Sequence, residues 1–225
     1  MGPQKTKDKK KRLIIVGAGG HAQVAASILY SYAPQPYQLM GYVDDDPELT
    51  GKRILGKQVL GSTAELSNID HDFVFVAVGE NKPRANIYKK LSSKEDKLVN
   101  LVHPDAIIAS DVELGQGVIV CAGVVVNTGA KIGNNVILNT GCTVDHHNRI
   151  QDHVHIAPGA HLGGDVNVGN GSLIGMGAII TPQHKIGEWS IVGAGAVVRK
   201  DVSSHVLVAG VPAEKIRDLA DKDSL

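Results

Sequence analysis

The chain has 225 residues, of which 43% are hydrophobic, and it carries 23 basic and 23 acidic side chains. A net charge of zero indicates no polyelectrolyte partner such as nucleic acid, and an aromatic content of 4% leaves few rings for stacking single-stranded bases. The length allows one large or two small domains, and no apolar run approaches the roughly 18 residues of a membrane-spanning helix. We expect Cys121 and Cys142 to be reduced packing residues of a cytoplasmic protein that binds no membrane.

The first segment, residues 1–12, carries six basic side chains and precedes the short apolar run Leu13–Val16. This arrangement superficially imitates a signal peptide. Glycines interrupt the apolar run after four residues, however, whereas a translocation core needs about 7–15. We therefore expect residues 1–12 to be a disordered basic leader.

Residues 13–103 are expected to form a Rossmann-like α/β domain that binds a nucleotide. Short continuous apolar runs predict buried strands, and amphipathic stretches between them predict helices. Strands are expected at 13–16, 39–43, 73–78 and 98–102, and helices at 21–32, from 61–66 onward and at 84–91.

A glycine turn, Gly17–Gly20, joins the first strand to the first helix, and the second strand ends in Asp44 and Asp45. Strand, glycine turn, helix and a strand ending in acid is the order of a mononucleotide-binding unit. Because helix N-termini attract phosphate, this turn is a candidate phosphate site; the alternative is a tight turn without a ligand. About 90 residues are too few for a six-stranded dinucleotide domain, so a nucleotide sugar fits better than NAD.

Residues 104–202 contain a six-residue repeat. Every sixth residue from Ile108 to Val198 is Ile, Leu or Val, at sixteen consecutive positions, and a second series of mostly small or β-branched residues lies two places before each. This period predicts a three-sided parallel β-solenoid of about five coils, each with 18 residues and a rise of about 4.8 Å. Residues 203–225 are expected to form a loop and a short helix at Ala213–Ala220 that caps the open end.

Five of the ten histidines fall within sixteen residues of the repeat: His146, His147, His153, His155 and His161. His146 and His147 occupy corner positions, where side chains point outward, and Gly164 follows His146 by eighteen residues, or one coil. A histidine stacked beside an accessible glycine N–H can act as a general base next to an oxyanion donor. The alternative is a solvated corner or a corner in a subunit interface.

Several motifs together resemble one family. They are Gly17-Ala18-Gly19-Gly20-His21, Val43-Asp44-Asp45-Asp46, Val78-Gly79, Asn139-Thr140, Val144-Asp145-His146, His153-Val154-His155-Ile156-Ala157-Pro158-Gly159 and Gly210-Val211-Pro212-Ala213. The sequence is similar to the bacterial nucleotide-sugar acetyltransferases of the PglD/NeuD-like group, which combine an N-terminal α/β domain with a left-handed β-helix. Three-sided prisms favour closed three-fold assembly, so we expect a homotrimer with sites between subunits. The resemblance implies acetyl-CoA as co-substrate, and we expect no metal. It implies as acceptor an amino group, most often at C4, of a nucleotide-linked amino-deoxy sugar used in surface glycan or glycoprotein biosynthesis.

The resemblance also implies roles for individual residues. His146 matches the catalytic base, and Gly164 matches the glycine whose N–H serves the thioester oxygen. The acetyl-CoA site is implied to include His155, Met176 and Ala194, and the nucleotide-sugar site to include Gly20, His21, Asp44, Asp45 and Gly79. The family typically has Glu or Asp after the base, where this chain has His147. Either His147 or Asp145 is therefore left to orient His146.

Three other functions remain open. An O-acetyltransferase acting on a sialic-acid-type sugar is the nearest alternative, and a non-catalytic scaffold is the second, because solenoids without activity exist. The third is a γ-type carbonic anhydrase, which holds zinc with three histidines, two of them in an H-x₄-H pair. No two histidines of this chain have that spacing, which disfavours zinc catalysis.

Overall fold

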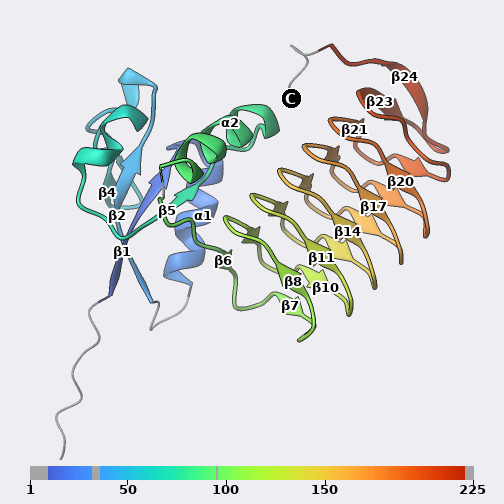
Figure 1. Cartoon of the computed structure of the whole chain (residues 1–225), viewed down its shortest axis with the longest axis horizontal. Helices are drawn as coiled ribbons and strands as arrows, with labels where there is room; N and C mark the ends of the chain where they lie inside the picture. The colour runs from blue at the N-terminus through green and yellow to red at the C-terminus, as the bar shows by residue number, and fades with distance from the viewer. Residues whose placement is uncertain (1–9, 32–35, 95, 221–225) are drawn as a thin grey trace, which may run out of the picture.

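The structure is a computed structural model that describes residues 10–31, 36–94 and 96–220. It consists of an α/β domain followed by a long parallel β-solenoid, as the sequence predicts (Figure 1). Most of the expected basic leader lies outside the described residues, and the first strand already includes Lys11 and Arg12. Among the described helices, none combines the length and the apolar character needed to cross a bilayer. The division of the chain between residues 103 and 104 stays a prediction.

The α/β domain contains a three-stranded parallel sheet in the order β2-β1-β5. Its strands are β1 (Lys11–Val16), β2 (Tyr37–Val43) and β5 (Phe73–Val76), and its helices are α1 (Gly20–Tyr30) and α2 (Asn81–Ser92). Smaller elements are η1 (Pro47–Leu49), β3 (Arg53–Ile54), β4 (Lys57–Gln58) and η2 (Thr63–Asn68). Leu13–Val16 is fully buried because the central strand of a parallel sheet is covered on both faces.

Two expectations for this domain need correction. The first helix ends at Tyr30, and Tyr32 lies outside the described residues. The strand expected at 98–102 is divided: Leu98 makes one bridge to Val74 of the domain, whereas β6 (Leu101–Val102) pairs with β9 of the solenoid. Backbone hydrogen bonds to the next coil, beginning with Leu101 N–H to Val118 O at 2.9 Å, explain the change of sheet.

The solenoid has three parallel sheets of two-residue strands, and each strand pairs with the strand eighteen residues farther along. The first face contains β7 (Ile107–Ile108), β10 (Val125–Val126), β13 (Thr143–Val144), β16 (His161–Leu162), β19 (Ile179–Ile180) and β22 (Val197–Val198). The second contains β8 (Glu113–Leu114), β11 (Lys131–Ile132), β14 (Arg149–Ile150), β17 (Asn167–Val168) and β20 (Lys185–Ile186). The third adds β9 (Ile119–Val120), β12 (Ile137–Leu138), β15 (His155–Ile156), β18 (Leu173–Ile174) and β21 (Ile191–Val192) to β6.

The apolar series forms the solenoid core. From Val120 to Val198, every sixth residue is at most 4% exposed, whereas Ile108 and Leu114 of the first coil are only half-buried. From Val118 to Ala196 the second series is also buried, except for the half-buried His184, and it includes Cys142. Cys121 is buried as well, and both cysteines are free, as expected. The unbroken period therefore fixes the register of every coil.

The prediction of a capping helix at Ala213–Ala220 is wrong. The chain instead forms an antiparallel hairpin of β23 (Val206–Ala209) and β24 (Glu214–Asp218), which continues the third face beyond β21 (Figure 1). All five residues of β24 are exposed, so a helix here would bury little apolar surface, whereas a strand can pair with the open edge of β23. The hairpin thus covers the edge that the helix was expected to cover.

Candidate active site

The corner between β13 and β14 carries the adjacent histidines. His146 and His147 are both exposed, and their Nδ1 atoms lie 3.0 Å apart, with the two rings tilted by 78°. A hydrogen bond between two Nδ1 atoms requires a proton on one and a lone pair on the other. The arrangement therefore leaves Nε2 of His146 free to accept a proton if its own Nδ1–H donates to His147.

Gly164 lies one coil beyond His146, as the spacing predicts. A Cβ atom at Gly164 would lie 2.4 Å from Cε1 and Nε2 of the His146 ring, so only glycine allows the ring to rest against this backbone. Within the described part of the chain, the Gly164 N–H has no intramolecular acceptor. A free N–H beside an imidazole matches the expected pair of oxyanion donor and general base.

Asp145 contacts the backbone of His146 rather than its ring nitrogens. Its Oδ1 accepts hydrogen bonds from the Asn127 side chain and from the His146 N–H, both at 2.8 Å. The Asn127 hydrogen bond and then the His146 N–H lower the pKa of this carboxyl. Two residues were candidates for orienting His146. His147 contacts the Nδ1 atom of the His146 ring, whereas Asp145 binds the backbone of the corner.

Asn148 supports the same corner from inside the solenoid. Its side chain is fully buried, and Nδ2 donates to the carbonyl oxygens of Asp145 at 2.6 Å and Gly163 at 3.0 Å. These carbonyls belong to the residues just before His146 and Gly164. Asn148 is not among the predicted site residues, although an amide in a series of small apolar residues is a signal for it.

His155 and His21 lie together where the α/β domain meets the solenoid, with ring centroids 6.5 Å apart. Asn139 Nδ2 donates to His155 Nε2 at 3.1 Å, and the Gly79 backbone makes a further hydrogen bond with this ring. Burial, followed by the charge of Arg84, lowers the pKa of His155 to about 3 and that of His21 to about 4. Both rings are therefore neutral near pH 7.

Arg84 on α2 joins the two domains, and it is not among the predicted site residues. The guanidinium donates to the carbonyl oxygens of Gly79 at 2.9 Å and Val78 at 3.2 Å on one side, and to those of His153 at 2.8 Å and Asn135 at 3.3 Å on the other. Burial lowers its pKa to about 9, and none of the bonds that the structure gives its guanidinium goes to a carboxylate. Nothing in the sequence distinguishes this arginine from an ordinary helix-surface residue.

The residues expected to bind the nucleotide sugar follow the carboxyl ends of β1, β2 and β5, where parallel sheets bind ligands. Asp44 Oδ2 accepts from the Ala18 N–H of the glycine turn at 2.7 Å, and Asp45 accepts from the Thr63 N–H at 2.8 Å. A Cβ atom at Gly20 or Gly79 would meet nothing within 4 Å, so open space lies above both residues. The structure thus brings together all five residues of the expected nucleotide-sugar site at one edge.

Met176 and Ala194 lie on the corner column that precedes the column of His146 along each coil. They are stacked one coil apart, since the N–H of Gly195 donates to Met176 O at 2.8 Å, and Met176 is 61% exposed. The structure gives neither residue a contact with His146. Their assignment to acetyl-CoA stays a prediction.

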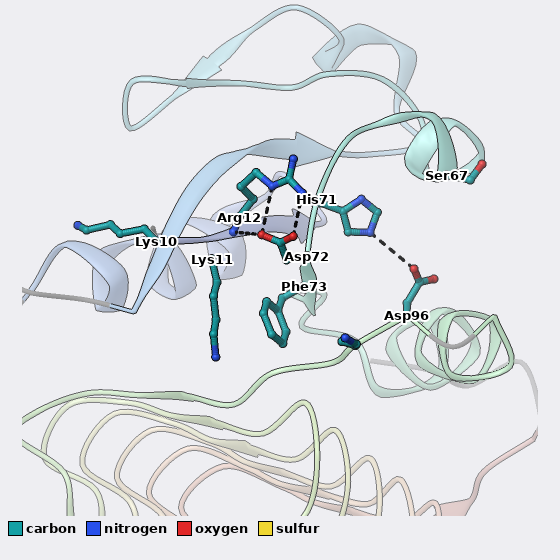
Figure 2. Close-up of a pocket in the computed structure, with 9 residues that line it drawn as sticks. Lys10, Lys11, Arg12, Ser67, His71, Asp72, Phe73 and Asp96 are labelled. Atoms are coloured by element: carbon teal, nitrogen blue, oxygen red, sulfur yellow. Dashed lines mark hydrogen bonds and ion pairs between the residues drawn. The ribbon is translucent and has the colours of Figure 1, made fainter. Parts of the chain in front are cut away.

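A separate open cleft of about 750 Å³ lies at the amino ends of β1 and β5 (Figure 2). Two pairs of side chains in it lie close together: Arg12 with Asp72 at 2.8 Å and His71 with Asp96 at 3.6 Å. Because ligands of such sheets bind at the carboxyl ends, this cleft lies on the wrong edge for the nucleotide.

Comparison with known proteins gives concordant results. Residues 12–91 match the model of the PglD N-terminal domain. Perosamine N-acetyltransferase from Caulobacter crescentus, solved as a single-residue variant with CoA and GDP-perosamine, is 37% identical, with a TM-score of 0.86 over 92% of this chain and 97% of that one. The acetyltransferase domain of PglB from Neisseria gonorrhoeae FA1090 is 36% identical, with a TM-score of 0.85 over 92% of this chain and all of that one. UDP-N-acetylbacillosamine N-acetyltransferase from Bacillus subtilis strain 168 is 35% identical over 114 residues, and the chain spans 52% of its length.

Proposed function

The chain belongs to the PglD-like family of β-helix nucleotide-sugar acetyltransferases, and from this premise we propose that it transfers an acetyl group from acetyl-CoA to the amino group of a nucleotide-linked amino-deoxy sugar. The observation that carries the proposal is the His146 ring resting against Gly164, whose N–H has no acceptor in the described structure. Relatives solved with CoA, acetyl-CoA or GDP-perosamine support both substrates.

The reaction is a direct transfer. The sugar nitrogen attacks the thioester carbonyl carbon, His146 Nε2 takes the proton that the nitrogen loses, and the Gly164 N–H stabilises the oxyanion. Breaking of the C–S bond then releases the CoA thiolate, which recovers a proton from His146. An acyl-enzyme on cysteine is disfavoured, because Cys142 is fully buried and burial raises its pKa to about 12.

The neutral pair of half-buried histidines supports the binding of the acceptor. His155 lies next to Gly79 and His21 beside His155, and because neither ring is charged near pH 7, neither repels the cationic form of a sugar amine. His21 Nε2 is buried and has no partner in the described structure, so it offers one polar atom to a ligand. We assign His155 to both acetyl-CoA and the acceptor.

We also infer a homotrimer with the site between subunits, because the His146 corner is exposed in one chain and three-sided prisms suit closed three-fold packing. A cytoplasmic location follows from the proposed substrates, since acetyl-CoA and nucleotide sugars are cytoplasmic metabolites. The homotrimer is tested by measuring the mass of the protein in solution.

The activity is tested with a panel of UDP-, dTDP- and GDP-linked amino sugars, with release of free CoA as the readout and mass spectrometry of the product. We expect turnover on one nucleotide class, with the acetyl group on nitrogen. His146→Ala should lower kcat by about 10²- to 10⁴-fold, whereas His205→Asn, at an exposed corner far along the chain, should not.

Each alternative predicts a different result. Acetylation of a hydroxyl group would assign the O-acetyltransferase function instead. A protein that binds acetyl-CoA but releases no CoA with any sugar, and is unaffected by His146→Ala, would be a scaffold.

A further inference from the structure

We propose that His146, His147 and Asp165 form a binding site for zinc or a similar divalent cation, and that the cation inhibits acetyl transfer. The binding part of the inference stands on the geometry of the three side chains. The inhibitory part rests on the proposed function, because it assumes that His146 is the catalytic base.

The repeat places these residues together. His147 and Asp165 are eighteen residues apart, so they occupy the same corner position on successive coils, with similar left-handed backbone angles, φ 60° and 57°. The Asp165 N–H donates to the His146 carbonyl oxygen at 2.9 Å, and this bond holds the coil of Asp165 against the coil of His146. One donor atom from each of the three side chains lies within 4.8 Å of the others.

The distances suit a metal ion after small side-chain rotations. Zinc binds imidazole nitrogen at about 2.0–2.1 Å and carboxylate oxygen at about 2.0–2.2 Å in a tetrahedron, so its ligand atoms lie about 3.3 Å apart. The two imidazole nitrogens already lie 3.0 Å apart, and all three side chains are exposed. Two histidines and one carboxylate leave a fourth position for water.

The chemistry of the donors selects the cation. Imidazole suits zinc, copper, nickel and cobalt, whereas magnesium and calcium prefer oxygen ligands. His147 adds a second imidazole beside His146, so the three side chains supply two nitrogen ligands and one carboxylate. This donor set favours zinc over magnesium or calcium.

The bound cation inhibits acetyl transfer because it removes the nitrogen lone pair that His146 needs as a base. As a base, His146 holds its proton on Nδ1, donates it to His147 and accepts a second proton on Nε2. A cation bound to both Nδ1 atoms moves the His146 proton to Nε2 without release of a proton, and Nε2 then has no lone pair for the sugar ammonium proton. A cation bound at Nε2 uses that lone pair directly, with the same result.

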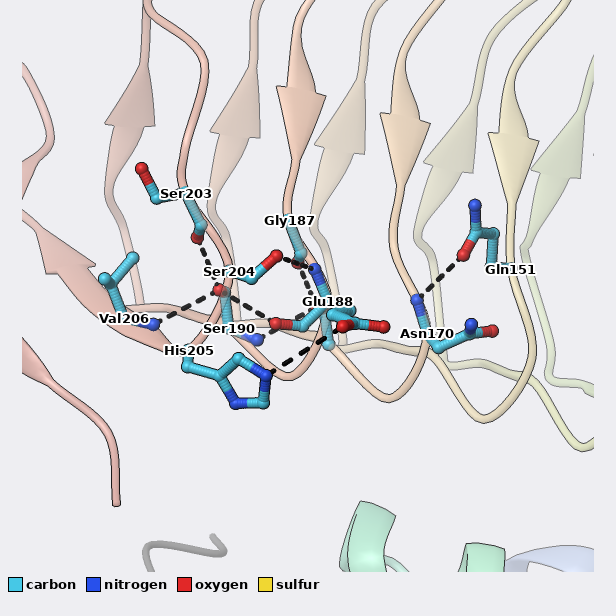
Figure 3. Close-up of polar contacts among 10 residues, drawn as sticks. Gln151, Asn170, Gly187, Glu188, Ser190, Ser203, Ser204, His205 and Val206 are labelled. Atoms are coloured by element: carbon cyan, nitrogen blue, oxygen red, sulfur yellow. Dashed lines mark hydrogen bonds and ion pairs between the residues drawn. The ribbon is translucent and has the colours of Figure 1, made fainter. Parts of the chain in front are cut away.

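The binding test uses the metal-free protein with Zn²⁺ in calorimetry and with Co²⁺ in visible absorption. We expect one ion per chain, and at least about tenfold weaker binding in His147→Asn and in Asp165→Asn. Asparagine tolerates left-handed backbone angles, so neither variant should disturb the corner. The matched control is His205→Asn, since His205 also has a left-handed φ, 57°, and lies 3.9 Å from a carboxylate, Glu188, but has no second imidazole there (Figure 3).

The inhibition test measures acetyl transfer by the wild-type protein at increasing Zn²⁺, followed by EDTA. We expect residual activity of about one tenth at ten times the Kd, full recovery with EDTA, and no effect of Mg²⁺ at the same concentration. Zinc binding that is unchanged in both asparagine variants, or full turnover by the zinc-saturated protein, would overturn the inference. If the metal-free protein acetylates no sugar, the proposed function fails, while the calorimetry still decides whether the metal site exists.

Discussion

Substitution of Gly164 by alanine tests the contact on which the proposed mechanism depends. The new methyl group would lie 2.4 Å from the His146 ring, whereas carbon and nitrogen atoms need about 3.5 Å. The ring must therefore move by about 1 Å, while the backbone N–H of residue 164 remains. A displacement of about 1 Å in a catalytic group costs about 100-fold in rate, which equals about 2.7 kcal/mol of transition-state stabilisation.

Stability should hardly change, because His146 is exposed and Gly164 has no left-handed φ that alanine would strain. We expect kcat to fall about 100-fold, with the KM values and the melting temperature near those of the wild type. The control is a double-mutant cycle: in a His146→Ala background the methyl group has no ring to displace, so Gly164→Ala should cause no further loss. An equal loss in both backgrounds would mean that the backbone, and not the ring, was disturbed.

Three further predictions concern buried and half-buried polar residues. Asn148→Val replaces the amide by an apolar side chain and leaves the carbonyls of Asp145 and Gly163 without the donor that the structure shows, so the corner loosens and both the melting temperature and kcat should fall; a variant with normal kcat would contradict this. Arg84→Lys has fewer donors for its four carbonyl partners, so the free energy of unfolding should fall and KM for the nucleotide sugar should rise more than KM for acetyl-CoA. His21 and His155 have folded-state pKa values of about 4 and about 3 against an ordinary 6.5, so the unfolded chain binds more protons below pH 6.5. Stability should be full above about pH 7 and fall by about 2 kcal/mol per histidine by pH 5, and urea unfolding of His155→Gln should lose about half of this dependence.

The solenoid could be predicted almost residue by residue, because its register depends on a local rule. Each coil repeats after eighteen residues, so arithmetic alone stacks Gly164 over His146 and Asp165 over His147. The C-terminal hairpin was missed because its formation depends on an open strand edge that no local pattern of 213–220 reveals. A short charged segment beside an unpaired edge gains more from strand pairing than from a helix with no apolar face.

The junction between the domains could not be predicted for a related reason. Arg84 is buried by coils that lie 51 and 69 residues farther along the chain, and its partners are backbone carbonyls, which leave no sequence signature. Asn81 behaves in the same way, since its side chain donates to Gly171 O at 2.9 Å and Ser172 O at 3.1 Å. Contacts to backbone atoms carry no pattern that periodicity can detect.

Two of the buried polar residues in the second series, Asn148 and Ser190, are the exception, because each marks an attachment. Asn148 holds the carbonyls beside the proposed base and its oxyanion donor. The Ser172 hydroxyl instead stays within the solenoid, where it donates to Gly187 O at 2.6 Å and accepts from the Ser190 N–H at 3.0 Å. Ser190 Oγ donates to Ser203 O at 2.7 Å and accepts from the Val206 N–H at 3.3 Å, and thereby holds the start of the terminal hairpin (Figure 3). Because a buried polar group is stable only with partners, a polar residue in this apolar series implies a nearby backbone group that the repeat itself does not satisfy. In this fold Asn148 and Ser190 therefore indicate where the solenoid is joined to its site and to its end, whereas the α/β domain attaches through backbone carbonyls that leave no such signal.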